Sequence, residues 1–61
     1  MNRLYIVVAY DYDNLPVNKA VFFDKDEANA FILNTDLYTQ GYNYVLVQEA
    51  SYSGNGAWIV D

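Results

Sequence analysis

The chain has 61 residues and a formal net charge of −5, with 3 Lys and Arg against 8 Asp and Glu. It contains no Cys and no His, which excludes disulfides, Cys/His zinc sites, thiol nucleophiles and histidine-based triads. Hydrophobic residues make up 54%, so a disordered tail is excluded and one small domain over residues 1–61 is expected. Because so small a domain buries little core, we expect self-association or a bound partner to add stability.

The first predicted element is a strand over residues 4–10, where apolar, β-branched and aromatic residues follow one another. We interpret this start as a strand rather than a signal peptide, because Asp11 ends the apolar run and no cleavage pattern follows. A strand with one solvated side alternates apolar and polar residues, whereas this one is apolar on both sides. It is therefore expected near the centre of a sheet.

Residues 11–16 form a predicted turn, and residues 19–23 form a second strand that pairs with the first. A helix then begins after Asp24 and runs to about Asn34 or Leu37. Asp24 is expected to cap its free N–H groups, with Glu27 reaching back to the N–H of Asp24. The helix stripe expected to pack on the sheet consists of Ala28, Phe31, Ile32 and Thr35.

An exit loop over residues 36–41 leads to a long third strand at residues 42–52. The Ser-Gly-Asn-Gly sequence at 53–56 is typical of a tight turn, and residues 57–60 form a short fourth strand. A right-handed crossover through the helix places the third strand beside the first. We therefore expect an α+β fold of ββαββ order, a four-stranded antiparallel sheet in the order 2-1-3-4 with one helix on one face.

One helix covers only one face of such a sheet, yet the predicted strands are apolar on both faces. An uncovered apolar face is typical of an interaction surface, and the 7 tyrosines suit one because each ring is apolar with a polar tip. The alternative is that the helix, the loops and the tyrosine rings bury both faces. The residues expected to form a self-association face are Tyr5, Val7, Val45, Val47 and Trp58, but the sequence leaves open which sheet face meets the helix, because a one-residue slip of register exchanges the two faces.

No catalytic, cofactor-binding or metal-binding residues can be assigned, and we expect a protein without enzymatic activity. Asp11 and Asp13 have the spacing of an EF-hand loop start, but Leu15, Pro16 and Phe22 occupy positions that need an oxygen ligand, Gly and Glu. Three basic residues are too few for phosphate contacts, so direct binding to nucleic acid or to an anionic membrane is not expected.

The acidic residues have two interpretations: they keep an apolar protein in solution, or they bind a basic surface such as the nucleic-acid channel of an enzyme. Asp11 and Asp13 in an extended segment lie about 6.8 Å apart, comparable to neighbouring phosphates, so mimicry of DNA is geometrically allowed. The residues expected to bind a partner are the acidic Asp11, Asp13, Asp24, Asp26, Glu27 and Asp36 and the aromatic Tyr10, Tyr12 and Tyr38.

In its size, acidity, lack of Cys and ββαββ pattern, the whole chain resembles small phage-encoded proteins that inhibit host machinery. Anti-CRISPR proteins, restriction inhibitors and inhibitors of polymerases or glycosylases are of this kind. The resemblance implies a cytoplasmic inhibitor that blocks a basic, nucleic-acid-binding surface of a larger protein. The alternative hypothesis is a structural homodimer that associates through the apolar sheet face, and a dimeric inhibitor would combine both.

Overall fold

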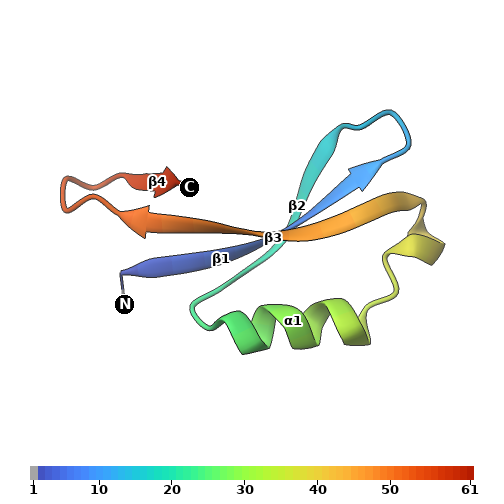
Figure 1. Ribbon diagram of the computed structural model, residues 1–61, viewed down its shortest axis with the longest axis horizontal. Coiled ribbons are helices and arrows are strands. Elements are labelled where there is room, and N and C mark those ends of the chain that lie inside the picture. The colour runs from blue at the N-terminus through green and yellow to red at the C-terminus, as the bar shows by residue number, and fades with distance from the viewer. Residues whose placement is uncertain (1) are drawn as a thin grey trace.

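A computed structural model describes residues 2–61, and its elements follow the predicted ββαββ order (Figure 1). The third strand has the predicted bounds, and the other elements differ from prediction by a few residues at their ends. The elements are β1 (Arg3–Asp11), β2 (Pro16–Phe22), α1 (Lys25–Asn34), the 3-10 helix η1 (Tyr38–Gln40), β3 (Tyr42–Tyr52) and β4 (Trp58–Val60).

The four strands form one antiparallel sheet in the order β2-β1-β3-β4, which confirms the predicted topology. β1 pairs with β3 along its whole length, whereas β4 pairs with β3 only from Ala50 to Tyr52. The β3–β4 hairpin therefore projects beyond α1, at the left of Figure 1. The radius of gyration is 12.3 Å, larger than the roughly 10.5 Å expected for a compact domain of this length.

β1 is the central strand, as its uninterrupted apolar sequence predicts. Val7, Val8 and Ala9 are 0%, 2% and 0% exposed. Val7 and Ala9 belong to the core cluster under α1, and Val8 points to the opposite face because side chains alternate along a strand. Both sides of β1 are thus removed from solvent at its middle.

α1 begins where the acidic sequence predicts. The side chain of Asp24 accepts a hydrogen bond from the N–H of Asp26 at 2.8 Å, which satisfies one free donor of the first turn. The predicted return bond from Glu27 to Asp24 is not among the hydrogen bonds of residues 2–61, and Glu27 is exposed instead. The helix ends at Asn34, the nearer of the two predicted ends.

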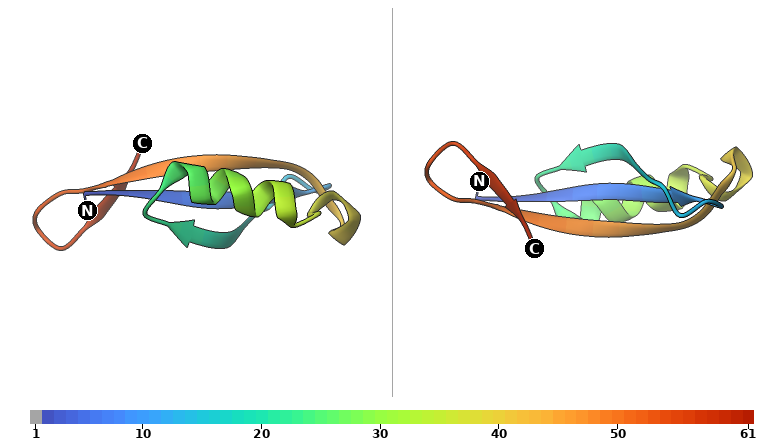
Figure 2. Two further views of the ribbon diagram at one scale, coloured as in Figure 1. Left: turned by 90° about the horizontal axis from the view of Figure 1, so that it is seen from below. Right: turned by 90° about the horizontal axis from the view of Figure 1, so that it is seen from above.

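α1 crosses one face of the sheet, as Figure 2 (left) shows from the helix side. Ala28 is fully buried, and Phe31 and Ile32 pack against the core from the same side, as predicted. A methyl side chain at the centre of the contact lets the helix approach β1 closely. The core consists of the buried Val7, Ala9, Ala28 and Leu37, with Tyr5, Ala20, Phe22, Phe31, Ile32, Tyr42, Val45 and Val47 packed against it.

Leu37 is a core residue that the sequence interpretation placed in an exit loop. Its side chain is 1% exposed, and its carbonyl accepts hydrogen bonds from the N–H groups of Gln40 at 3.1 Å and Tyr42 at 3.3 Å. A single leucine within a loop sequence belongs to no periodic apolar pattern, so the sequence does not predict that its side chain is buried. The segment after α1 is therefore packed against the core through Leu37.

β2 begins at Pro16, earlier than the predicted start at Lys19. Proline lacks an N–H donor, but it is tolerated as the first residue of an edge strand. The register of β2 on β1 shifts between Val7 and Val8, whose partners are Ala20 and Asn18, so Lys19 is left over as a β-bulge. β2 is thus a shorter and more irregular edge than β3.

Candidate protein-interaction surface

No helix of residues 2–61 packs on the sheet face opposite α1, which Figure 2 (right) shows from above. Because strand side chains alternate, the residues between the core positions point to this side. We call this side the open face. It comprises Leu4, Ile6, Val8, Tyr10, Pro16, Asn18, Val21, Tyr44, Leu46, Gln48, Ala50, Tyr52, Trp58 and Val60.

Two aromatic pairs lie at opposite ends of the open face. Tyr10 on β1 stacks on Tyr44 of β3, with ring centroids 4.5 Å apart and planes 11° apart. Tyr52 on β3 meets Trp58 of β4 at 5.2 Å and 54°. Such cross-strand aromatic pairs hold their rings in place before any partner arrives, which lowers the entropy lost on binding.

The open face carries no formal charge, although it is partly exposed to solvent. Val8 and Ala50 are covered by larger neighbours, whereas Val21 and Val60 are 55% and 52% exposed. Charged residues are depleted and aromatic residues enriched at the centres of protein interfaces. No cavity is found in residues 2–61.

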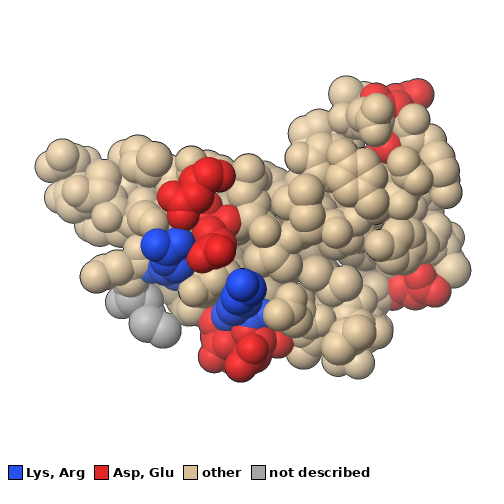
Figure 3. All heavy atoms as spheres, viewed as in Figure 1, with Lys and Arg blue, Asp and Glu red and all other residues tan. Residues whose placement is uncertain are grey.

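Seen from one side, charged side chains form separate groups on the surface (Figure 3), and no charged residue is among those of the open face. Asp11 and Asp13 flank the turn between β1 and β2, and Asp36 precedes η1 at the same end of the sheet. Asp26 and Glu27 lie in the first turn of α1. The predicted acidic binding residues are thus exposed or half-exposed, but the structure distributes them along the margin instead of joining them in one patch.

Three of these carboxylates have local structural roles. The Asp11 side chain accepts hydrogen bonds from the N–H groups of Asp13 at 2.9 Å and Leu15 at 3.0 Å, which closes the hairpin turn. Asp24 caps α1, and Asp36 accepts a bond from the N–H of Thr39 at 3.3 Å. These roles leave the negative charge at the surface, so turn chemistry and electrostatic attraction of a partner are compatible uses of the same groups.

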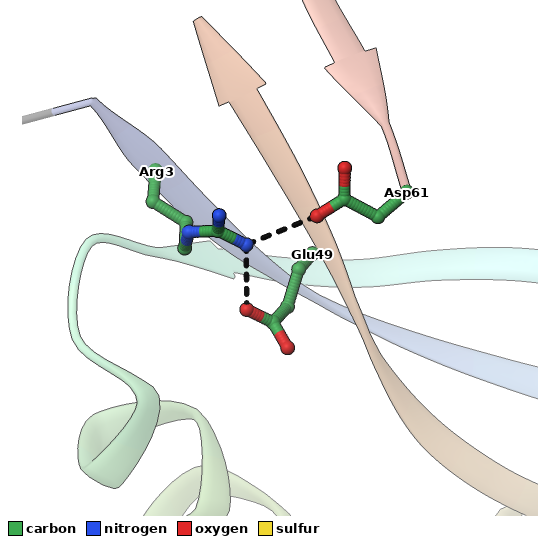
Figure 4. Close-up of polar contacts among 3 residues, drawn as sticks. All are labelled: Arg3, Glu49 and Asp61. Carbon is green, nitrogen blue, oxygen red and sulfur yellow. Dashed lines mark hydrogen bonds and ion pairs between the residues drawn. The ribbon is translucent and has the colours of Figure 1, made fainter.

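A small ion cluster joins the first and last strands (Figure 4). One guanidinium nitrogen of Arg3 lies 2.9 Å from a Glu49 oxygen and 3.0 Å from an Asp61 oxygen. The hydrogen bonds that Arg3 donates to Glu49 and, with a smaller effect, to Asp61 raise the pKa of Arg3 above its ordinary value, although slight burial opposes them. The cluster neutralises Arg3 and leaves one excess negative charge beside β4.

Lys19 is also engaged with the protein itself. Its ammonium group donates to the Tyr42 hydroxyl at 3.0 Å and lies 4.7 Å from the centre of the Tyr42 ring. Lys25 lies at the start of α1, between Asp24 and Asp26. Two of the three basic residues thus contact groups of the protein itself, and the margin of the open face is negative on balance.

The predicted self-association face was assigned to the wrong side of the sheet for most of its residues. Tyr5, Val7, Val45 and Val47 pack in or against the core under α1, and Val7 is fully buried. Only Trp58 lies on the open face. A one-residue change of register exchanges the two faces of a strand, and a strand that is apolar on both sides has no pattern to decide between them.

The predicted aromatic anchors do not form one group. Tyr10 lies on the open face, stacked on Tyr44. Tyr12 is 73% exposed in the turn after β1, and Tyr38 is 58% exposed in η1. The sequence interpretation missed Tyr44 and Tyr52 as members of the two aromatic pairs. Their even spacing along β3 was a usable signal, because strand residues two apart point to the same face.

No group of three or more carboxylates in residues 2–61 could hold a metal ion. Within the same part of the chain, no helix has the length and hydropathy of a membrane-spanning segment. Comparison with protein-family models, with curated proteins and with solved structures finds no match to this chain.

Proposed function

We propose that this protein is a non-enzymatic binding protein that docks its open face on a larger protein in the cytoplasm. The observation that carries the proposal is an apolar, aromatic sheet face without a charged residue, while every charge lies around it. Exposed apolar surface of this kind is typical of contact sites, and paired Tyr and Trp rings are typical energetic centres of such contacts.

The charge of the margin suggests the chemistry of the partner. The chain has a net charge of −5, and two of its three basic residues are bound to groups of the protein itself. A partner with basic residues around an apolar patch would be attracted at long range and held by the aromatic centre. Nucleic-acid-binding enzymes have such surfaces, so blocking one of them is the function we infer, in line with the resemblance to small phage inhibitors.

The proposal is tested by neutralising charge outside the open face. Immobilised protein captures partners from an extract of the source cells, and the captured protein is purified and titrated directly. Replacing Asp11, Asp13, Asp26 and Glu27 with the corresponding amides should weaken binding at least about tenfold at low salt, mainly by slowing association. Raising the salt concentration should shrink the difference between the two proteins.

Two results would contradict the proposal. One is a purified partner whose contact surface is not basic. The other is affinity that stays the same for the wild type and the neutralised variant at low and high salt alike. The second hypothesis, a structural homodimer associating through the open face, would gain support if no partner were captured and a dimer in solution were dissociated by Trp58→Ala.

A further inference from the structure

The outer edge of β3 lacks a strand partner over most of its length. β4 pairs only with Ala50 to Tyr52, and the N–H of Asp61 adds one bond to the carbonyl of Glu49. No strand in residues 2–61 pairs with the outer side of the segment 44–48. In Figure 2 the helix lies over the middle of the sheet and leaves this edge uncovered. We call the segment Tyr44–Gln48 the free edge.

The hydrogen-bonding groups of the free edge point outward at two residues. Odd-numbered residues of this segment bond away from β1, since Glu49 and Ser53 bond to the β4 segment, whereas Tyr52 bonds to Asn2 beside β1. By the alternation of an antiparallel ladder, Val45 and Val47 direct their N–H and C=O groups to the open side. Both side chains are half-buried members of the core, so an added strand would also complete their cover.

The two edges of the sheet are protected very differently. β2 begins with Pro16, contains the bulge at Lys19 and carries a charge, all features that discourage pairing with another strand. The free edge has the sequence Tyr-Val-Leu-Val-Gln, with no charge, no Pro, no Gly and no bulge. An edge of this kind readily pairs with another strand, and here it is the unprotected one.

We propose that the free edge pairs with the free edge of a second copy of this chain, antiparallel about a two-fold axis at Leu46. With the axis at Leu46, the midpoint of the free edge, the arrangement is self-complementary. Val45 of each copy lies opposite Val47 of the other copy, and each of these two pairs forms two hydrogen bonds. Leu46 meets the partner's Leu46 on the open face, where residues in a non-hydrogen-bonded pair lie close together.

A second copy fits this edge better than a charged peptide for reasons of charge and chain course. The segment has no charge for a peptide to complement, and two copies placed in this way bring no like charges together within it. Asp61, directly after β4, already bonds to Glu49 at one end of the free edge, and a bulge at Asn43 interrupts the strand at the other end. Pairing with a second copy is therefore limited to the free edge. The dimer would have one continuous sheet of both copies, with their open faces on the same side.

The first test removes one hydrogen-bond donor of the free edge, the outward-pointing N–H of Val45. The protein is synthesised chemically with an N-methyl group on Val45, and its mass is measured by sedimentation equilibrium. Val21 gives a matched control: it is the same residue type on the β2 edge, opposite Ile6, and its N–H points away from β1. We expect the wild type and the protein with N-methyl Val21 to form dimers with the same dissociation constant. N-methyl Val45 should raise the dissociation constant of the dimer about thirtyfold, the effect of losing two ordinary hydrogen bonds.

A second measurement needs no variant. Amide hydrogen exchange of the wild type is followed by NMR over a range of protein concentrations. The N–H groups of Val45 and Val47 should become protected as concentration rises, while that of Val21 should continue to exchange rapidly. A monomer at all concentrations, fast exchange at both residues in a dimer, or a dimer that tolerates N-methyl Val45 would each overturn the proposal.

These results are distinct from a failure of the proposed function. The pairing uses the edge of β3, and Trp58 and Tyr52 remain uncovered in the dimer. Salt separates the two contacts further, because screening weakens attraction to a basic partner but reduces repulsion between two copies of charge −5. The dimer should therefore hold at high salt under conditions that release the partner.

Discussion

Both faces of this sheet have an apolar centre, but they are built from different side chains. The face under α1 has small and branched residues at its centre, with Ala9 and Ala20 in or against the same cluster as Ala28 of the helix. The open face has aromatic pairs at both ends and no helix over it. Small residues allow close packing between elements, whereas Tyr and Trp rings with polar tips suit a surface that is alternately wet and covered.

Three leucines allow this contrast to be measured with one residue type. Leu37 is 1% exposed under α1, Leu46 is 36% exposed on the open face, and Leu33 is 86% exposed on the outer side of α1. If the face under α1 is the core and the open face is a contact surface, the cost of truncation should fall in that order. Each variant is compared by urea unfolding of dilute protein.

Leu37→Ala should have the largest effect. Removing a fully buried leucine side chain leaves a cavity, and losses of about 2–5 kcal/mol are usual. For a domain of this size such a loss approaches the whole free energy of unfolding. A loss below about 1 kcal/mol would mean that the segment after α1 does not anchor the core.

Leu46→Ala should cost less, roughly 1 kcal/mol, because much of the side chain already contacts water. The free energy of unfolding is again taken from urea denaturation, under the same conditions. A loss equal to that of Leu37→Ala would contradict the contrast between the faces, since it would make the open face a second core.

Asp24→Ala tests the helix that distinguishes the faces. Loss of the N-cap hydrogen bond to Asp26 should cost about 1 kcal/mol and reduce the protection of α1 amides in hydrogen exchange. Asp24→Asn is the control, because an asparagine oxygen can accept the same bond. If both variants behaved like wild type, the cap would contribute nothing to holding α1 over the sheet.

Leu33→Ala should change the stability least, by no more than about 0.5 kcal/mol in either direction. This leucine projects from α1 into solvent, and alanine has the higher helix propensity. A loss above 1 kcal/mol would show that the outer side of α1 is covered in solution, which would move the contact surface away from the open face.

Much of the fold follows from local patterns in the sequence. Continuous apolar residues identify β1 as central, Asp24 marks the start of α1, and the crossover rule places β3 beside β1. The choice of face did not follow, because residues 4–10 are apolar on both sides and a strand repeats every two residues.

The bulges and the buried loop residue escaped prediction for a related reason. Lys19 and Asn43 are left out of the strand pairing by neighbours on other strands, and nothing in their own sequence context marks them. Leu37 is buried because the chain turns back on the sheet after α1. The acidic residues were identified correctly as surface groups, but their separation along the margin depends on the tertiary fold.

The central claim is that the open face, and no other apolar surface, contacts the partner. It is tested most directly by titrating the purified partner with wild type, Trp58→Ala and Leu33→Ala after all three are shown to be folded. We expect Trp58→Ala to weaken binding by at least about 2 kcal/mol, as for an aromatic residue at the centre of an interface, and Leu33→Ala to bind like wild type. Equal binding by Trp58→Ala and wild type, or a loss confined to Leu33→Ala, would contradict the account.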